Sequence, residues 1–342
     1  MDRHRVVPGK RALAALGLML ALFLSGCAGD AQVKRQLFAL DTLIELTAYG
    51  DQAEAGLDAA TELLFEMDAM LDVYDENSEL SQLNAAGGSS ALSPALLELW
   101  VDAETMYAAT GGVFDPSIQP VIALWGFGTE NPAQPADADL AAALELVGFS
   151  RVERSGSAVR LPEGMQVSFG AIAKGYIAQK MSETLQGAGV ESAILSLGGN
   201  VQTLGLHPDG SPWQVALLDP QDTGSAAGIL TVGAGTAVVT SGGYQRYFEE
   251  NGIIYHHILD PETGYPADSG LLSVTVVCAD GAAADALSTA LFILGEDGAL
   301  RHRAESAISY DLVLITQDGR VVVTGELDFH LEGGAYTYEH VD

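Results

Sequence analysis

Strand-like and helix-like segments follow one another along this chain without regular alternation, and this order restricts the fold more than any other feature. "RQLFALDTLIELTAYG" has strand composition, whereas "AEAGLDAATELLFEMDAMLDVY" has apolar residues at helical spacing. Strand patterns recur over residues 190–278, followed by a helical pattern over roughly 282–294 and a hairpin pattern near 310–324. A doubly wound sheet needs strands and helices in steady succession, so the sequence predicts an α+β fold.

Capping residues predict where two helices begin. Asp51 precedes the first helical stretch, where its side chain can accept from free backbone N–H groups. Ser93 followed by Pro94 is typical of a second helix start. In contrast, "VFDPSIQPVIALWGFG" is interrupted by Pro116 and Pro120 and is rich in aromatic residues, so we expect a binding loop there rather than a regular element.

The chain is strongly acidic. It has 342 residues, 48% of them hydrophobic, and its 46 acidic and 15 basic residues give a formal net charge of −31. Such a surface repels a polyphosphate backbone, so we expect no nucleic-acid partner. Solubility alone accounts for the acidity. The charge still sets a condition for function, because any anionic substrate needs a cation in its site.

The first 26 residues have the pattern of a secretory signal. Basic residues precede the apolar core "ALAALGLMLALFL", which is too short and wrongly flanked for a membrane-spanning helix. The stretch Leu24-Ser25-Gly26-Cys27 resembles the bacterial lipobox, which implies a lipoprotein signal peptide over residues 1–26 and lipid on Cys27. The alternative is an ordinary signal peptide with an incidental cysteine. We expect an extracytoplasmic lipoprotein anchored to a membrane by acyl chains, with residues 27–35 as a tether.

One cysteine remains after such a cleavage. Cys278 lies in the apolar strand pattern "LLSVTVVCAD", which favours a buried and unreactive thiol. A lone thiol cannot form an internal disulfide, and the sequence has no cysteine-rich metal site.

Three glycine-centred stretches stand out, and the first is a candidate for anion binding. "SFGAIAKGYIAQKM" runs into a helix with Lys174 near its start, where backbone N–H groups and a cation can meet an anion. "LSLGGN" and "VVTSGGYQRYF" are strands that run into paired glycines, and Arg246 lies in the second. Neither matches a dinucleotide fingerprint or a P-loop, and most helix starts of this kind bind nothing.

Asp285 and Thr289 lie four residues apart in a helical pattern and therefore share one face of the helix. A carboxylate and a hydroxyl are hard oxygen ligands that suit Mg²⁺. The alternative interpretation is structural, because an Asp near a helix start favours the helix dipole and a helical Thr can bond to its own backbone.

Two of the seven histidines are adjacent in "YHHILDPETGYP". The Asp-Pro and Thr-Gly pairs that follow predict a turn. Strand alternation puts His256 on the face of Ile254 and Ile258, and His257 on the face of Tyr255 and Leu259. The pattern does not say which face meets a ligand, and either histidine can be structural.

Taken in order, these stretches resemble the FAD:protein FMN transferases, the ApbE-type flavin transferases. The resemblance rests on "LDT", "YDENSELSQLN", "TGGVFDPSIQPVIALWGFG", "GAIAKGY", "LSLGGN", "TSGGYQRYF", "HILDPETGYP" and "DALSTALFILG", and it covers residues 36–330. It implies one compact domain with a T-fold-like α+β architecture, mixed or antiparallel sheets, packed helices and an inserted lobe. Residues 331–342 are left as a C-terminal tail. The implied activity is the Mg²⁺-dependent transfer of FMN from FAD to a threonine hydroxyl of an acceptor flavoprotein, with release of AMP.

The resemblance also implies the residues that meet FAD. The family reads "MGT" where this chain has Leu40-Asp41-Thr42, and it usually has Asp where this chain has Ser168. The positions that match FAD contacts are Leu40, Tyr74, Val113, Phe114, Asp115, Ser168, Lys174 and Leu259.

The metal ligands and the base follow from the same resemblance. Asp285 and Thr289 match side-chain ligands of Mg²⁺, and Ala171 matches a carbonyl ligand. Ser288 stands where some members carry another Asp, which favours one metal ion over two. His257 matches the family histidine proposed as general base, and we expect His256 to be structural. A base is needed because a threonine hydroxyl is a poor nucleophile at neutral pH.

Other functions fit the same residues. A Mg²⁺-dependent FAD pyrophosphatase would use this site with water as the nucleophile and give FMN and AMP. A non-enzymatic flavin-binding lipoprotein would need neither the base nor the metal ligands, and a structural envelope lipoprotein would need none of these motifs in order. The acceptor itself leaves no trace in the sequence.

Overall fold

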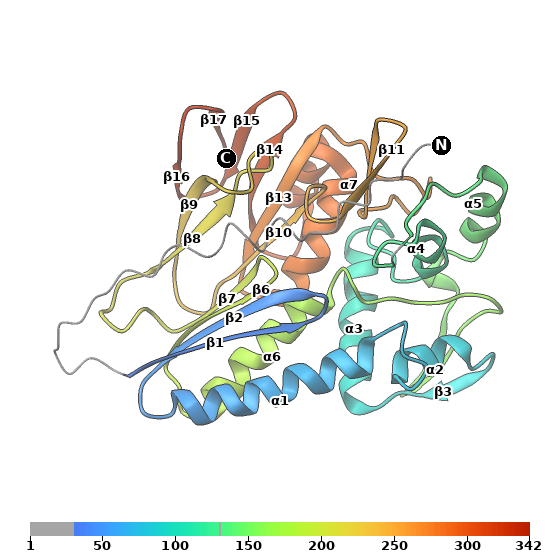
Figure 1. Cartoon of the computed structure of the whole chain (residues 1–342), viewed down its shortest axis with the longest axis horizontal. Coiled ribbons are helices and arrows are strands. Elements are labelled where there is room, and N and C mark those ends of the chain that lie inside the picture. The colour runs from blue at the N-terminus through green and yellow to red at the C-terminus, as the bar shows by residue number, and fades with distance from the viewer. Residues whose placement is uncertain (1–30, 130) are drawn as a thin grey trace.

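A computed structural model describes residues 31–129 and 131–342 (Figure 1). The predicted signal peptide and Cys27 lie outside the described residues. Within the described part of the chain, no helix is both long and apolar enough to cross a membrane.

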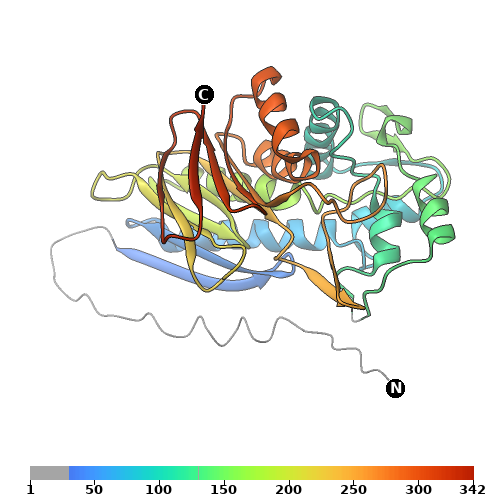
Figure 2. The same ribbon diagram turned by 90° about the horizontal axis from the view of Figure 1, so that it is seen from above.

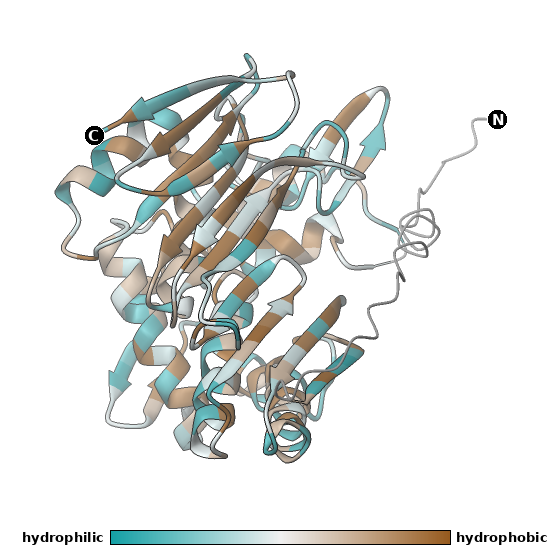
Figure 3. Ribbon diagram, turned by 90° about the vertical axis from the view of Figure 1, so that its left-hand side faces the viewer, coloured by the Kyte–Doolittle hydropathy of each residue, from teal (hydrophilic) through white to brown (hydrophobic). Residues whose placement is uncertain are grey.

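A nine-stranded sheet runs through the centre of the molecule. Its strand order is β1-β2-β6-β7-β10-β13-β14-β15-β17, and neighbours are antiparallel except for the parallel pair β15 and β17. The strands are β1 (Gln32–Ala39), β2 (Thr42–Tyr49), β6 (Ser192–Leu197), β7 (Asn200–Leu204), β10 (Ala237–Gly242), β13 (Leu271–Cys278), β14 (Asp311–Thr316), β15 (Arg320–Thr324) and β17 (Thr337–Val341). Figure 3 shows apolar and polar residues alternating along several of these strands.

Both faces of this sheet are covered, which gives three layers (Figures 1 and 2). Helices α1 (Ala53–Leu71), α6 (Ala173–Gly187) and α7 (Gly281–Glu305) cover one face and enclose the main core. A small sheet of β8 (Trp213–Leu218), β9 (Ala226–Val232) and β16 (Asp328–Leu331) covers the other face with a second core of mainly Val, Leu and Ile. The alternating burial of β8 reflects this arrangement, because its apolar residues face inward.

A lobe is inserted between α1 and α6. It contains α2 (Glu79–Ala85), α3 (Pro94–Ala109), α4 (Gln119–Trp125), α5 (Asp137–Leu144), the 3₁₀ turn η2 (Phe149–Arg151) and a small sheet of β3 (Ser89–Ala91), β4 (Glu153–Ser155) and β5 (Ala158–Arg160). A hairpin of β11 (Tyr247–Glu250) and β12 (Ile253–His256) packs on this lobe through a third, aromatic core around Trp125. The chain is therefore α+β with an inserted lobe, as predicted.

Several local predictions are confirmed. Ser93 caps α3, because its hydroxyl accepts from the N–H of Leu96 at 3.3 Å, and Pro94 is the first helical residue. Regular helical geometry in α7 is broken at Gly295, where φ is 73° and ψ 179°, next to the predicted helix end at 294. Cys278 is a buried free thiol, and burial raises its pKa to about 11.

Other local predictions are wrong. Residue 52, not Asp51, precedes the first turn of α1, and no side chain caps that helix. The expected loop over "VFDPSIQPVIALWGFG" contains helix α4, because Pro120 falls in the first turn, where no backbone N–H is needed. The expected tail over 331–342 supplies β17, an edge strand of the central sheet, and the expected tether over 27–35 already includes the start of β1.

Candidate functional site

The crossing of α6 and α7 fixes the position of Asp285. The helices meet at Gly175 and Gly281: a Cβ atom on Gly175 would lie 1.9 Å from the carbonyl oxygen of Gly281 and 2.7 Å from Cβ of Asp285. This close backbone approach needs glycine. As a result the N–H of Gly175 donates to Oδ2 of Asp285 at 2.9 Å, and Asp285 is 3% exposed. The carboxylate is held rigidly against the first turns of α6.

Thr289 lies one turn further along α7, in a chain of hydroxyl groups. Ser288 donates to the carbonyl oxygen of Asp285 at 2.8 Å, so its contact with Ser241 at 2.8 Å has Ser241 as the donor. In the 3.3 Å contact between Ser241 and Thr289, Thr289 is then the donor and Ser241 the acceptor. Because each hydroxyl has only one proton, this order leaves the lone pairs of Thr289 available as ligands.

These residues fit a magnesium ion. Among the described residues no group of three His, Cys, Asp or Glu side chains could hold a metal, so a metal here would need mixed oxygen ligands. Asp285 is a buried carboxylate, and no described residue is found hydrogen-bonded to its second oxygen, Oδ1. Ala171, the predicted carbonyl ligand, lies two residues before the start of α6. Ser288 is fully buried and already hydrogen-bonded, which favours a single ion.

Among the described residues, only one ring nitrogen of His257 has a hydrogen-bond partner. Its backbone N–H donates to the carbonyl oxygen of Arg246 at 3.1 Å, and its Nδ1 lies 3.2 Å from the same oxygen. A carbonyl oxygen only accepts, so Nδ1 must carry the proton and Nε2 the free lone pair. Burial, followed by the positive charges of Arg246 and Lys174, lowers the pKa of His257 to about 3. The ring is neutral at pH 7, in the form that a general base requires.

His256 differs from its neighbour in having partners for both ring nitrogens. Its Nε2 donates to the carbonyl oxygen of Ala267 at 3.1 Å, and its Nδ1 accepts from the N–H of Ile258 at 3.3 Å. The ring also packs edge-on against Phe292, with centroids 5.5 Å apart. His256 is therefore a satisfied structural residue. Strand alternation grouped His256 with Ile254 and Ile258, but only Ile258 is buried, whereas Ile254 is 60% exposed near the end of the hairpin.

Two cations stand near His257. Lys174 is the second residue of α6 and forms no ion pair with any described residue, and its charge acts on the His257 ring. Arg246 is 44% exposed at its side chain; it donates to the carbonyl oxygen of Asp41 at 3.2 Å and lies 3.8 Å from that residue's carboxylate. An anionic ligand would meet these cations in an otherwise acidic protein. The sequence hinted at Arg246 through "TSGGYQRYF", but it did not identify it as a site residue.

The turn between β1 and β2 borders the site, because its residue Asp41 contacts Arg246. Leu40 and Asp41 both have left-handed backbone conformations, with φ of 52° and 55°. These values are those of a tight hairpin turn that usually contains Asn or Gly. Leu40 is held by its N–H, which donates to Oδ1 of Asp68 at 3.2 Å. Tyr74 is 57% exposed and donates its hydroxyl to the carbonyl oxygen of Phe127 at 3.2 Å, so its ring stands open for stacking.

The remaining predicted contacts lie in two loops that touch each other. The N–H of Ser168 donates to the carbonyl oxygen of Pro116 at 2.8 Å, which joins the approach to α6 with the loop that follows α3. In that loop Val113 is half-buried and Phe114 is 3% exposed. Asp115 accepts from Ser117 N–H at 2.8 Å and Phe149 N–H at 3.2 Å, so its carboxylate shapes the loop itself.

Leu259 is also buried, in the aromatic core of the lobe. Phe114, Asp115 and Leu259 can therefore offer a ligand their backbone more readily than their side chains.

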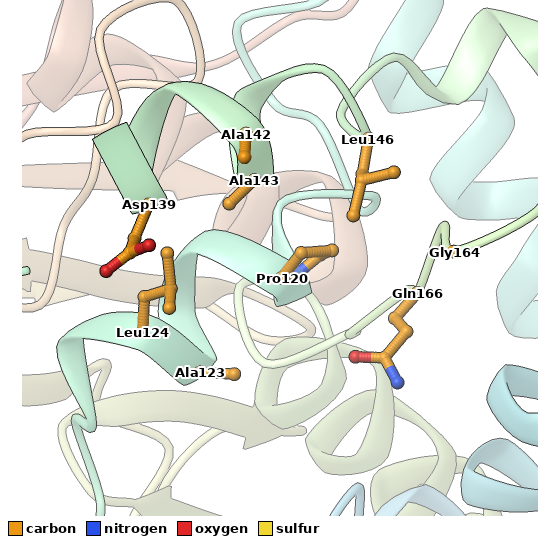
Figure 4. Close-up of a pocket in the computed structure, with 9 residues that line it drawn as sticks. All are labelled: Pro120, Ala123, Leu124, Asp139, Ala142, Ala143, Leu146, Gly164 and Gln166. Atoms are coloured by element: carbon orange, nitrogen blue, oxygen red, sulfur yellow. The ribbon is translucent and has the colours of Figure 1, made fainter. Parts of the chain in front are cut away.

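A surface groove lies away from these residues. It has a volume of about 440 Å³ and runs between α4 and α5 (Figure 4). Its walls are mainly apolar, with Leu124, Leu146 and Pro120 beside the polar Asp139 and Gln166. None of the residues that match FAD or metal contacts lines it.

Comparisons with known proteins agree with the geometry. A sequence model described as the ApbE family matches residues 40–310. An FAD:protein FMN transferase of Treponema pallidum is 33% identical over 307 residues, which cover 82% of this chain and 85% of that protein. One of Klebsiella pneumoniae is 35% identical over 272 residues, covering 77% and 83%.

Solved structures give the same result. The ApbE protein of Thermotoga maritima superimposes with a TM-score of 0.80 at 28% identity, covering 85% of this chain and 96% of that one. The flavinyl transferase ApbE of Pseudomonas stutzeri, in its apo form, gives a TM-score of 0.75 at 28% identity, covering 85% and 93%.

Proposed function

Because this chain belongs to the ApbE family and is an FAD:protein FMN transferase, we propose that it transfers FMN from FAD to a threonine hydroxyl of an acceptor protein, with Mg²⁺ and with release of AMP. The observation that carries this proposal is the pair formed by a rigid, buried Asp285 and a neutral His257 with a free Nε2. The first suits a cation that meets phosphate oxygens, and the second suits removal of a hydroxyl proton.

In this proposal each residue has a defined task. Nε2 of His257 takes the proton of the threonine hydroxyl, whose oxygen forms a bond to the phosphorus of the FMN half. The bond from that phosphorus to the oxygen bridging to AMP breaks, and AMP leaves with the electron pair. Lys174 and Arg246 balance the phosphate charge and hold the diphosphate near His257.

The metal site would consist of Asp285, Thr289 and the carbonyl group of Ala171. When bound there, Mg²⁺ supplies charge neutralisation and polarisation of the phosphate oxygens. Tyr74 and the turn at Leu40 would face the flavin ring, and the backbone near Val113 and Leu259 would line the rest of the substrate.

The direct test is the mass of a candidate acceptor after incubation with enzyme, FAD and Mg²⁺. We expect one added FMN per acceptor and one AMP released for each, with no addition when the acceptor threonine is replaced by alanine. Free FMN and AMP beside an unmodified acceptor would instead identify a pyrophosphatase that uses water. FAD binding without any cleavage would identify a flavin-binding protein.

We also propose that the mature protein is an extracytoplasmic lipoprotein. The motif that supports this is Leu24-Ser25-Gly26-Cys27 at the end of the apolar leader. Cys27→Ser should leave the leader uncleaved or release the protein from the membrane, as measured by fractionation and by the mass of the N-terminal peptide. Unchanged processing and anchoring would contradict the proposal.

A further inference from the structure

The β11–β12 hairpin exposes three large apolar side chains. Tyr247 is 51% exposed, Ile253 54% and Ile254 60%, and we call these three residues the hairpin patch. Tyr247 and Ile254 share one face of the hairpin, and Ile253 lies beside the turn on the opposite face, so the patch wraps around the hairpin. Asn251 and Gly252 join the strands through a tight turn, with φ of 53° and 79°. Apolar exposure of this extent on one short hairpin, in a chain with a net charge of −31, is typical of an interaction site.

The hairpin is held firmly by its other side chains. Phe248 and Tyr255 stack with ring centroids 5.3 Å apart, and Tyr255 packs at 5.3 Å on Trp125 in the core of the lobe. The hydroxyl of Tyr255 also donates to Oε1 of Gln134 at 2.9 Å. In Figure 1 the hairpin stands at the upper right of the body, on the side of the lobe helices α4 and α5. The patch is thus presented on a fixed support.

The hairpin is continuous along the chain with the reacting groups. β11 begins directly after Arg246, and β12 ends one residue before His257. A strand rises about 3.3 Å per residue, so Ile254 lies roughly 10 Å along the chain from the base. Within the described residues, the hairpin pairs with no further strand. A protein segment that brings a hydroxyl to Nε2 of His257 therefore comes within a few residues' length of this hairpin.

We propose that the hairpin patch is the docking surface for the acceptor protein, and that it binds an apolar segment of the acceptor a few residues from the modified threonine. This inference rests on the proposed function, because that function requires a protein to reach His257. The groups that suit FAD lie at the base of the hairpin and not in the patch: Arg246 directly precedes β11, and the charge of Arg246 acts on both His257 and Tyr74. A second copy of this chain is the competing occupant, and the test below separates it.

The test uses the full chain with Ile253→Ser and Ile254→Ser combined, and the acceptor identified by its added FMN. We expect KM for the acceptor to rise on the order of tenfold or more, with kcat and the KM for FAD unchanged. Leu218→Ser is the matched control, because Leu218 is an apolar residue, 48% exposed, on β8 in the outer sheet. That variant should behave as wild type.

A shortened acceptor sharpens the test. A tripeptide centred on the acceptor threonine cannot span the distance to Ile254, so the double variant and the wild type should modify it at equal rates. An unchanged KM for the full acceptor would overturn the docking proposal, as would a raised KM for FAD. A wild-type dimer that the double substitution converts to monomers, with acceptor KM unchanged, would assign the patch to self-association. Failure of the wild type to modify either acceptor would contradict the proposed function instead.

Discussion

The two ends of the site are built in different ways. At the Asp285 end, two helices approach so closely that their backbones touch at Gly175 and Gly281, and the carboxylate is almost completely buried. At the His257 end, a half-buried ring depends on one carbonyl oxygen of a loop, beside an exposed hairpin. A substitution at the Asp285 end should therefore lower both activity and stability, whereas a substitution at the His257 end can lower activity and leave the fold intact. This contrast predicts which substitutions harm both properties and which harm one.

Asp285→Ala should have the largest effect. It removes the carboxylate proposed for Mg²⁺ and leaves the N–H of Gly175 without its acceptor, so we expect turnover to fall on the order of 10³-fold. The unpaired N–H should also cost about 1–3 kcal/mol of stability. Asp285→Asn is the matched variant, because it keeps an acceptor for Gly175 and loses only the charge. FAD turnover should be measured for both variants across a Mg²⁺ titration. Wild-type activity of either variant at limiting Mg²⁺ would show that Asp285 is not a metal ligand.

Gly175→Ala should come next. The new methyl group would meet the carbonyl oxygen of Gly281, so α6 and α7 must move apart, at a cost of about 1–3 kcal/mol in unfolding free energy. Because this movement displaces Asp285, the transfer rate should also fall about 10²-fold. Gly187→Ala is the control in the same helix, since a Cβ there has no atom within 4 Å and should not destabilise the protein. Equal denaturant midpoints for the two variants would contradict the close helix contact.

Arg246→Gln should have a smaller effect and leave the fold intact. The carbonyl oxygen that orients His257 belongs to the backbone and remains, while one cation beside the substrate is lost. We expect KM for FAD to rise about tenfold at low salt, with little change in kcat. Arg160→Gln removes the same charge from the lobe sheet and serves as the control. A fall in kcat with KM unchanged would show that Arg246 acts in the chemical step and not in binding.

The effect of His257 on stability should be the smallest at pH 7 and should appear only as the solution becomes acidic. His257 has a pKa of about 3 in the folded protein, below its value near 6.5 in the unfolded chain, so the unfolded chain binds more protons between these values. The contribution of His257 therefore lowers stability as the pH falls from 6.5 towards 3. His257→Gln should flatten the acid side of the curve of unfolding free energy against pH. An unchanged slope would mean that the ring is not shielded in the folded state.

Much of this architecture could be predicted from the sequence, because the information was local. The cap at Ser93, the helix face shared by Asp285 and Thr289, and the strand that hides Cys278 each follow from spacing or residue type. The contact between Gly175 and Gly281 could not be predicted in this way, since it joins residues 106 positions apart. The same holds for β17, whose exposed, polar sequence looks like a tail until β15 is beside it.

The two histidines show most clearly what the sequence alone could not predict. Strand alternation separated their faces but could not choose between them, because the choice depends on which acceptors surround each ring. Arg246 and Ala267 supply those acceptors from loops on either side of the hairpin. The family resemblance selected His257 by position, and the hydrogen bonds give a physical reason for that assignment.

In the proposed reaction His257 activates the acceptor hydroxyl, whereas its neighbour His256 only supports the fold. The most direct measurement is the single-turnover rate of FMN transfer for His257→Ala and His256→Ala, with FAD above its dissociation constant so that binding losses do not contribute. We predict a loss of roughly 10²–10⁴-fold for His257→Ala with unchanged unfolding free energy. For His256→Ala we predict a rate near that of wild type and a lower unfolding free energy. A normal rate for His257→Ala beside a large loss for His256→Ala would contradict the account.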